Sequence, residues 1–336
     1  MVYKERRELL KKLEAKRNSK IICYLTSDRK PFVASIAEDI IKVFFEHLEK
    51  IKKTKTIELF IYSRGGDVMT CYRLVNLVRE YCDKFNVIIP HRAHSGATLI
   101  SLGANEIYMT ELGELSPIDP STANDFNPVP QNNPNQKIPI SVENVTSYIS
   151  LAKEKMGLTE QDQIVNVFNR LVEKIHPLAL GNVNRAHSQI RMLAKKLLDL
   201  HITGENKEHI KKTIIDNLTE KLYSHQHYIS RKEAKNDIKL NIKDFKKDEQ
   251  DIVLKLFNDF NSDMQLDNHF EPLIKLSKQD VQEVNEPSNL AFIEDINFSD
   301  FCAVEYKFKK VITNPNIPDA FQSITIPIKT EIWKRQ

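Results

Sequence analysis

Four short, almost continuously apolar runs in the first 110 residues have the pattern of strands that are buried on both faces of a parallel sheet. These runs are residues 21–27, 56–63, 86–90 and 105–110. Neighbouring segments place apolar side chains at the spacing of an amphipathic helix. These segments are residues 5–18, 36–52, 71–82 and 97–104. Strands and helices that alternate over short connections predict an α/β fold with layers of helix on a sheet.

The pattern changes after residue 110. Residues 116–141 hold six prolines and many Asn and Ser residues, which predicts an ordered loop beside a site or, alternatively, a simple linker. Residues 143–202 and 206–222 return to helical spacing, and beyond residue 245 a helix precedes strand-like runs. We therefore predict three regions. They are an N-terminal helix (1–20), an α/β domain (21–245) and a small C-terminal α+β extension (246–336).

Composition narrows the function classes. Lys and Arg number 49 and Asp and Glu 46, and the resulting net charge of +3 argues against general nucleic-acid or membrane-surface binding. No apolar run approaches the ~18–20 residues of a membrane span, and the N-terminus lacks the apolar core of a secretory signal. The four cysteines form no CxxC pair, which argues against a disulfide scaffold or a zinc site. We expect a cytoplasmic protein with no metal and no cofactor.

Glycine is scarce in the chain, so the positions that do use it are expected to need it for a backbone reason. Two such places are candidates for a functional site. The chain holds only 8 glycines, whereas about 7% is usual. Gly65 and Gly66 follow a buried strand and precede a helix, so the backbone can turn there and direct its N–H groups toward an anion or a developing oxyanion. The alternative is a tight turn without a ligand.

Ser95 and Gly96 form the second such place, between a strand and an apolar helix. A serine at this junction is presented as a nucleophile, and the Gly96 amide could bind the same oxyanion. Alternatively, Ser95 is an ordinary N-cap, which contributes about 1 kcal/mol to a helix. The GxxxxGK[ST] pattern of a phosphate-binding loop is absent.

Taken in order, the motifs IELFIYSRGGD, HSGATLISLGANEIYM and ELSPIDP resemble the Clp/crotonase-fold serine proteases. The resemblance is closest to the serine dehydrogenase proteinase (SDH) family, related to signal peptide peptidase A and the Clp protease, and it covers about residues 5–242. It implies a stack of ββα units and a serine endopeptidase. By position, it implies Ser95 as the nucleophile and the Gly66 and Gly96 amides as the oxyanion hole, with Gly65 supporting the turn.

The resemblance does not identify the general base. Ile118 stands where the Clp protease has a histidine. Three candidates remain, each with a structural alternative: His225 beside Gln226, Lys137 as in serine–lysine relatives, and His176 before a proline. His94 adjoins Ser95, but neighbours along a chain usually point apart. Asp119 either orients a partner or caps a turn.

Two other functions fit these residues. The absent histidine at position 118 allows a catalytically inactive scaffold or effector partner with the same fold. A crotonase-type acyl-CoA enzyme would use paired amides without needing Ser95. For a peptidase we expect a peptide or protein substrate and a homo-oligomer, since relatives form trimers or rings. The C-terminal extension could bind a regulatory protein, and its strands are also suited to edge pairing.

Overall fold

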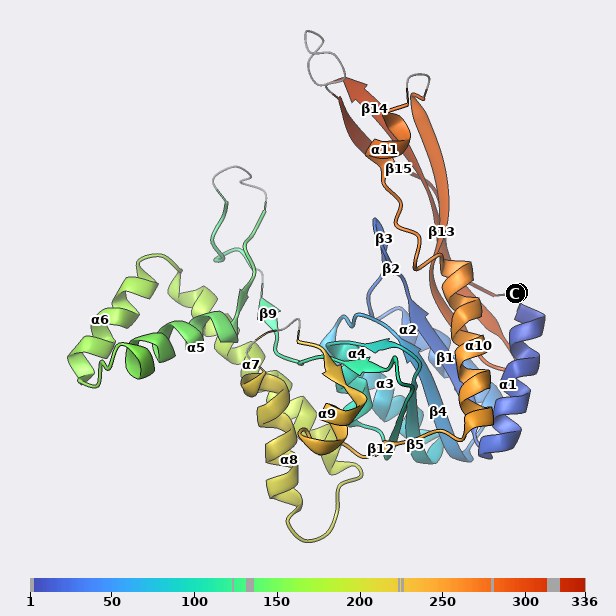
Figure 1. Cartoon of the computed structure of the whole chain (residues 1–336), viewed down its shortest axis with the longest axis horizontal. Coiled ribbons are helices and arrows are strands. Elements are labelled where there is room, and N and C mark those ends of the chain that lie inside the picture. Colours follow the sequence, from blue (N-terminus) through green and yellow to red (C-terminus); the bar gives the residue numbers. More distant parts are fainter. Residues whose placement is uncertain are drawn as a thin grey trace. The chain divides into compact units, whose positions relative to one another are not determined.

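An eight-stranded sheet organises the first of two units in the computed structural model (Figure 1). The structure describes residues 3–122, 124–130, 136–222, 224, 227–278, 281–312 and 321–335. The first unit comprises Met1–Glu114 with Asn241–Gln336, and the second comprises Leu115–Leu240. The predicted α/β class is confirmed. No helix among the described residues is long and apolar enough to cross a membrane.

The sheet has a parallel part and an antiparallel part. The parallel strands, in spatial order, are β12 (Ile242–Lys243), β7 (Glu106–Met109), β5 (Cys82–Ile89), β4 (Thr54–Tyr62) and β1 (Lys20–Thr26). The antiparallel strands that follow are β13 (Glu283–Glu294), β14 (Ser299–Ile312) and β15 (Phe321–Arg335). The second half of β4 is buried throughout, as its apolar pattern predicts for a central strand.

Helices cover both faces of the parallel strands. α1 (Tyr3–Arg17) and α10 (Lys247–Met264) pack against each other, and their apolar residues join Cys23 and Leu25 of β1 in one buried cluster. Tyr24, which alternation places on the opposite face, contacts Phe44 of α2 (Ile40–Ile51) with ring centroids 5.5 Å apart. α3 (Val68–Glu80) packs against α2, and α4 (Gly96–Leu102) packs against α3.

The segment predicted as a C-terminal extension contributes directly to this sheet. β13 pairs with β1, and Arg6 of α1 makes a bidentate bond to Glu294 of β13 at 2.8 and 2.7 Å. Arg6 also donates to Asp259 of α10 at 2.8 Å, and all three side chains are buried. Hydrophobic spacing predicts strands in this region but not their partners, so the pairing with β1 could not be foreseen from the sequence.

A buried histidine joins α2 to the β13–β14 turn. Nε2 of His47 lies 3.0 Å from Asp300 and Nδ1 lies 3.3 Å from Asp295, and the imidazole is fully buried. Burial alone would lower the pKa of His47, but its contacts with the two carboxylates outweigh burial and raise that pKa. Arg335 at the end of β15 also donates to Asp300. This cluster ties the two long strands that follow β13 to the body of the first unit.

Short strands and one small helix complete the first unit. They are β2 (Asp28–Arg29), β3 (Phe32–Val33), β6 (Arg92–Ala93), β8 (Glu114–Leu115, at the boundary) and α11 (Pro272–Leu276). β2 and β3 form a hairpin. Phe32 of β3 packs into a second buried cluster with Phe270, Leu276 and Phe308. The antiparallel strands continue past the end of β1, with α11 beside them (Figure 1), and this cluster lies between these elements.

The second unit is mostly helical. Its elements are β9 (Ser121–Thr122), β10 (Ile140–Ser141), α5 (Val142–Ser150), η1 (Leu151–Lys155), α6 (Gln161–Val172), α7 (Pro177–Asp199), α8 (Lys207–Asp216), η2 (Asn217–Lys221), β11 (Ile229–Ser230) and α9 (Arg231–Asn236). β9 pairs with β10, so the described ends of the proline-rich segment form a strand pair. The buried Asn127 donates to the carbonyl of Ile138 at 2.8 Å inside this segment. The helical prediction for residues 143–222 agrees with these elements.

Candidate active site

The turn after β4 requires two glycines. Gly65 has φ +97° and Gly66 has φ +155°, values that side-chain-bearing residues rarely adopt. A Cβ atom on Gly66 would overlap the backbone of Ile36, whose Cα would be only 2.8 Å away. Asp67 then begins α3, and its carboxylate accepts a hydrogen bond from the Thr70 amide at 2.7 Å. The sequence RGGD thus combines a sharp turn with an N-capped helix.

Ser95 occupies a strained turn between β6 and α4. Its φ of +50° with ψ of −113° lies outside the regions favoured by L-residues, and such strain costs on the order of 1–3 kcal/mol. The side chain makes no capping hydrogen bond to α4, all of whose residues are described. The N-cap interpretation therefore does not account for this serine.

The two turns lie in direct contact. The Ser63 amide donates to the Arg92 carbonyl at 3.0 Å, and the His94 amide donates to the Ser63 carbonyl at 2.9 Å. A Cβ atom on Gly65 would lie 2.6 Å from the Gly96 nitrogen and 2.9 Å from the Ser95 Cβ. These distances show that the GG turn packs against the backbone of the serine turn with no room for a side chain.

The amides of Gly66 and Gly96 lie beside Ser95. The bonds that fix the first turn run from Ile36 to the Gly65 carbonyl at 2.9 Å and from Asp67 to the Ile36 carbonyl at 2.8 Å, and neither uses the Gly66 amide. Gly96 is the first residue of α4, so its amide has no acceptor within the helix. A Cβ atom on Gly96 would lie 3.1 Å from the Gly66 nitrogen. Two backbone amides therefore lie close together at the serine turn.

Charged side chains surround these turns within the first unit. Arg64 and Arg92 donate to Asp28 at 2.8 and 2.9 Å, and Arg92 also donates to Glu114 at 2.9 Å. His94 places Nε2 3.0 Å from Glu114. Burial alone would raise the pKa of Glu114, but His94 and Arg92 outweigh burial and lower it, so this carboxylate is charged at neutral pH. The sequence does not reveal the His94–Glu114 pair, because His94 follows β6 whereas Glu114 begins β8.

Cys71 of α3 packs against the serine turn at Gly96. Its thiol is fully buried on α3, and its Sγ would lie 2.8 Å from a Cβ on Gly96. Burial raises the pKa of this thiol, so it stays protonated at neutral pH. Cys71 therefore packs against the serine turn as a small apolar residue.

Comparison with known proteins places this site in a family. The family described as "ClpP-like SDH-type serine proteinase" matches residues 1–174, more than half of the chain. The chain belongs to this family. The resemblance inferred from the motifs around Gly65 and Ser95 is confirmed.

Two relatives and one solved structure are also similar to the chain. Methanocaldococcus jannaschii has two, "Uncharacterized protein MJ0137" (31% identical over 121 residues) and "Uncharacterized protein MJ1495" (39% over 64 residues). The alignments cover 34% and 19% of this chain, and they span only 42% and 22% of these relatives. A probable enoyl-CoA hydratase/isomerase from Mycobacterium abscessus is similar over 77% of both chains, with 11% identity and a TM-score of 0.33.

The predicted bases belong to the second unit. Nζ of Lys137 donates to the carbonyl of Asp125 at 3.2 Å. His176 caps α7, with Nδ1 accepting from the Leu178 amide at 3.2 Å, and its exposed ring stacks on Phe126 at 4.8 Å. His225 and Gln226 lie outside the described residues.

Ile118 and Asp119 are buried, with exposed fractions of 2% each. The amide of Ile118 donates to the carbonyl of Leu218 at 3.0 Å. The side chain at position 118 is therefore apolar and buried, and it cannot transfer a proton.

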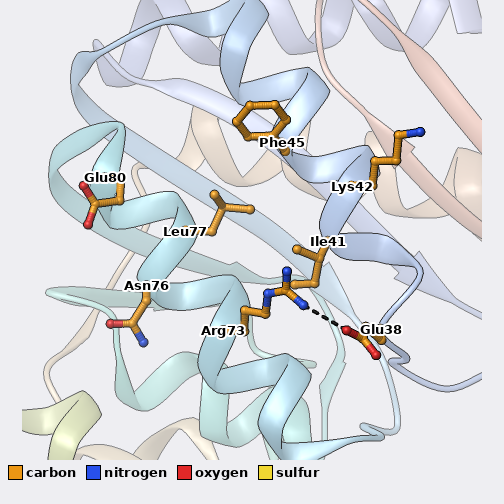
Figure 2. Close-up of a pocket in the computed structure, with 8 residues that line it drawn as sticks. All are labelled: Glu38, Ile41, Lys42, Phe45, Arg73, Asn76, Leu77 and Glu80. Carbon is orange, nitrogen blue, oxygen red and sulfur yellow. Dashed lines mark hydrogen bonds and ion pairs between the residues drawn. The ribbon is translucent and has the colours of Figure 1, made fainter.

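A groove between α2 and α3 is separate from the serine turn. It has a volume of about 570 Å³ and contains Phe45 and Leu77, with the Arg73–Glu38 ion pair of 2.9 Å at its rim (Figure 2). Its lining comes from the outer surfaces of the two helices and from Glu38, and it includes neither Ser95 nor the three glycines of the turns. The groove therefore does not form part of the candidate active site.

Proposed function

We propose that this protein is a cytoplasmic serine endopeptidase in which Ser95 is the nucleophile and the amides of Gly66 and Gly96 form the oxyanion hole. One observation carries the proposal: Ser95 is held at φ +50° in a turn that packs directly against the Gly65–Gly66 turn. Membership of a serine proteinase family supports the same assignment.

The chemistry follows from these positions. Ser95 Oγ attacks the carbonyl carbon of a peptide bond while its proton passes to a general base. The carbonyl oxygen becomes negatively charged, and the two amides donate hydrogen bonds to it; each such donor contributes roughly 10²–10³ in kcat in related reactions. The leaving amine takes the proton from the base, and water then hydrolyses the acyl-enzyme. Gly65 contributes by keeping the two turns in contact.

A fluorophosphonate probe tests the nucleophile. We expect the purified protein to be labelled and Ser95→Ala to lose the label. Ser101→Ala is the matched control, because Ser101 is a buried serine of α4, the helix that follows Ser95, and its hydroxyl donates to the Ala97 carbonyl at 2.9 Å. Labelling that survives Ser95→Ala would refute the assignment.

The base is identified by substitution. His225→Ala, Lys137→Ala and His176→Ala are compared for the rate of probe labelling between pH 5 and pH 9. Replacement of the base should lower the rate and abolish its pH dependence, whereas the other two variants should follow the wild-type profile. If all three variants keep the wild-type rate and pH profile, none of these residues is the base.

A second function is favoured by Ile118. Because an apolar residue replaces the histidine of the Clp protease, the chain could instead be an inactive member of the fold that assembles as a scaffold or binds an effector protein. The probe distinguishes the two functions, since a scaffold would not be labelled at Ser95 in any oligomeric state.

A further inference from the structure

The outermost strand of the sheet presents an exposed, uncharged edge. β15 pairs with β14 on one side, and no strand of the described residues pairs with its other side. Residues 322–326 of β15, here termed the edge segment, read Gln-Ser-Ile-Thr-Ile and contain no charge, no proline and no glycine. Ile324 and Ile326 are 40% and 41% exposed. Short uncharged segments rich in β-branched residues pair readily when they lie at a sheet edge.

The register shows why these isoleucines stay uncovered. Thr325 lies opposite Phe308 of β14, whose side chain is buried in the cluster with Phe32. Ile324 and Ile326 lie opposite Lys309 and Lys307, on the other face of the strands. The protein's own core therefore covers only the Phe308 face. On that face α11 leaves two further apolar side chains, Leu273 and Ile274, 50% and 66% exposed.

We propose that the edge segment pairs with the edge segment of a second copy of this chain, antiparallel about a two-fold axis at Ile324. Such an interface is isologous, so each side provides the same residues. Ile324 then meets its counterpart, Ser323 meets Thr325, and Gln322 meets Ile326, so that no like charges face each other. The axis is perpendicular to the sheet, which brings the two α11 helices to the same face of the joined sheet.

Charge distribution favours this arrangement over a face-to-face contact. Lys309 lies beside the isoleucines and would repel the same lysine of a copy stacked on this face, whereas Lys307 is paired with Glu283 at 3.1 Å. In the edge-to-edge pair, the two β14 strands are three strand spacings apart, about 14 Å. This separation exceeds the Debye length of about 8–10 Å at physiological salt, so the repulsion is largely screened.

The flanking residues limit the contact to a closed dimer. Pro327 has no N–H group to donate, and the β14–β15 register is irregular next to it, so pairing ends there. The opposite edge of the sheet is β12, which is only two residues long. Pairing therefore cannot propagate from copy to copy through the sheet, and the symmetric pair is the expected product.

Light scattering after size-exclusion chromatography tests the proposal on the full chain. Ile324→Lys places two like charges opposite each other at the axis, and we expect the mass of the wild-type assembly to fall by half. Ile332→Lys is the matched control, because Ile332 lies on the same strand outside the edge segment and is 67% exposed. It should keep the wild-type mass. Circular dichroism checks that both variants are folded.

Cross-linking provides the second measurement. Residues facing each other across antiparallel strands have Cα atoms about 4.5–5.5 Å apart, within the range for a disulfide. Ile324→Cys should therefore form a covalent dimer under mild oxidation, whereas wild type and Ile332→Cys should not. An unchanged mass for Ile324→Lys, or cross-linking no greater than that of Ile332→Cys, would overturn the proposal. Neither measurement depends on whether Ser95 is catalytic.

Discussion

Replacement of Gly65 by alanine should separate the two turns of the candidate active site. At φ +97° an alanine is strained by roughly 1–3 kcal/mol, of which about 0.4–1 kcal/mol is recovered because the unfolded chain is less flexible. In addition, its methyl group would lie 2.6 Å from the Gly96 nitrogen and 2.7 Å from the His94 carbonyl oxygen. Both are backbone atoms, so the serine turn itself must move, at a further cost of about 1–3 kcal/mol.

The chain contains a matched control for this strain. Gly204 has φ +95°, almost the value of Gly65, but nothing lies within 4 Å of a Cβ built on it. Gly204→Ala should therefore lose only about 1–2 kcal/mol, whereas Gly65→Ala should lose about 2–5 kcal/mol. Urea unfolding followed by circular dichroism measures both losses. The difference between the two variants isolates the overlap from the backbone strain.

The rate of probe labelling then measures how displacement of the serine turn affects the reactivity of Ser95. If the amides of Gly66 and Gly96 form the oxyanion hole, Gly65→Ala should react with a fluorophosphonate at least about tenfold more slowly than wild type, because the donors and Ser95 no longer align. Gly204→Ala should react at the wild-type rate. A Gly65→Ala variant that is as stable as Gly204→Ala and is labelled equally fast would refute the contact between the turns as the cause.

Three further predictions concern stability. Arg6→Ala leaves buried carboxylates unpaired and should cost about 3–5 kcal/mol in urea unfolding; a loss below about 1 kcal/mol would contradict this. The pKa of His47 is raised in the folded state, so its pairing with Asp295 and Asp300 contributes fully to stability below about pH 6.5 and less as pH rises through the folded-state pKa. The urea midpoint of unfolding should therefore fall over that pH range, and His47→Gln should remove this pH dependence. Gly181→Ala, within α7 and with nothing within 4 Å of its Cβ, should stabilise by about 0.5–1 kcal/mol, measured as a raised Tm.

In this chain, sequence patterns predict individual strands and helices better than they predict which strands and side chains pair with each other. β4 and β5 could be identified because strands buried on both faces are apolar at nearly every position. The pairing of β13 with β1 could not, because the alternating pattern of an antiparallel strand does not specify its neighbour. The same limit applies to Arg6 and Glu294, which are 288 residues apart and each resemble an ordinary surface charge in the sequence.

The candidate site, too, was predictable from the sequence only in part. Scarce glycines next to a buried strand indicated the Gly65–Gly66 turn, since glycine is favoured where φ is positive. Nothing in the sequence indicates that Ile36 fills the space beside Gly66, because it does so with backbone atoms that every residue has. The His94–Glu114 contact was likewise hidden, since it depends on how β6 and the start of β8 approach each other.

The conformation of Ser95 is the strongest physical argument for a role beyond structure. Glycine could make this strand-to-helix turn without strain, yet position 95 is a serine at φ +50°. It also places Gly65 and Gly96 where any side chain would push the turn away from the Gly66 amide. Strain of this kind persists only where the surroundings enforce it, and it concentrates at functional sites. A turn that only connected β6 to α4 would need neither the strained serine nor the close glycine packing, whereas a nucleophile aligned with two amide donors needs both.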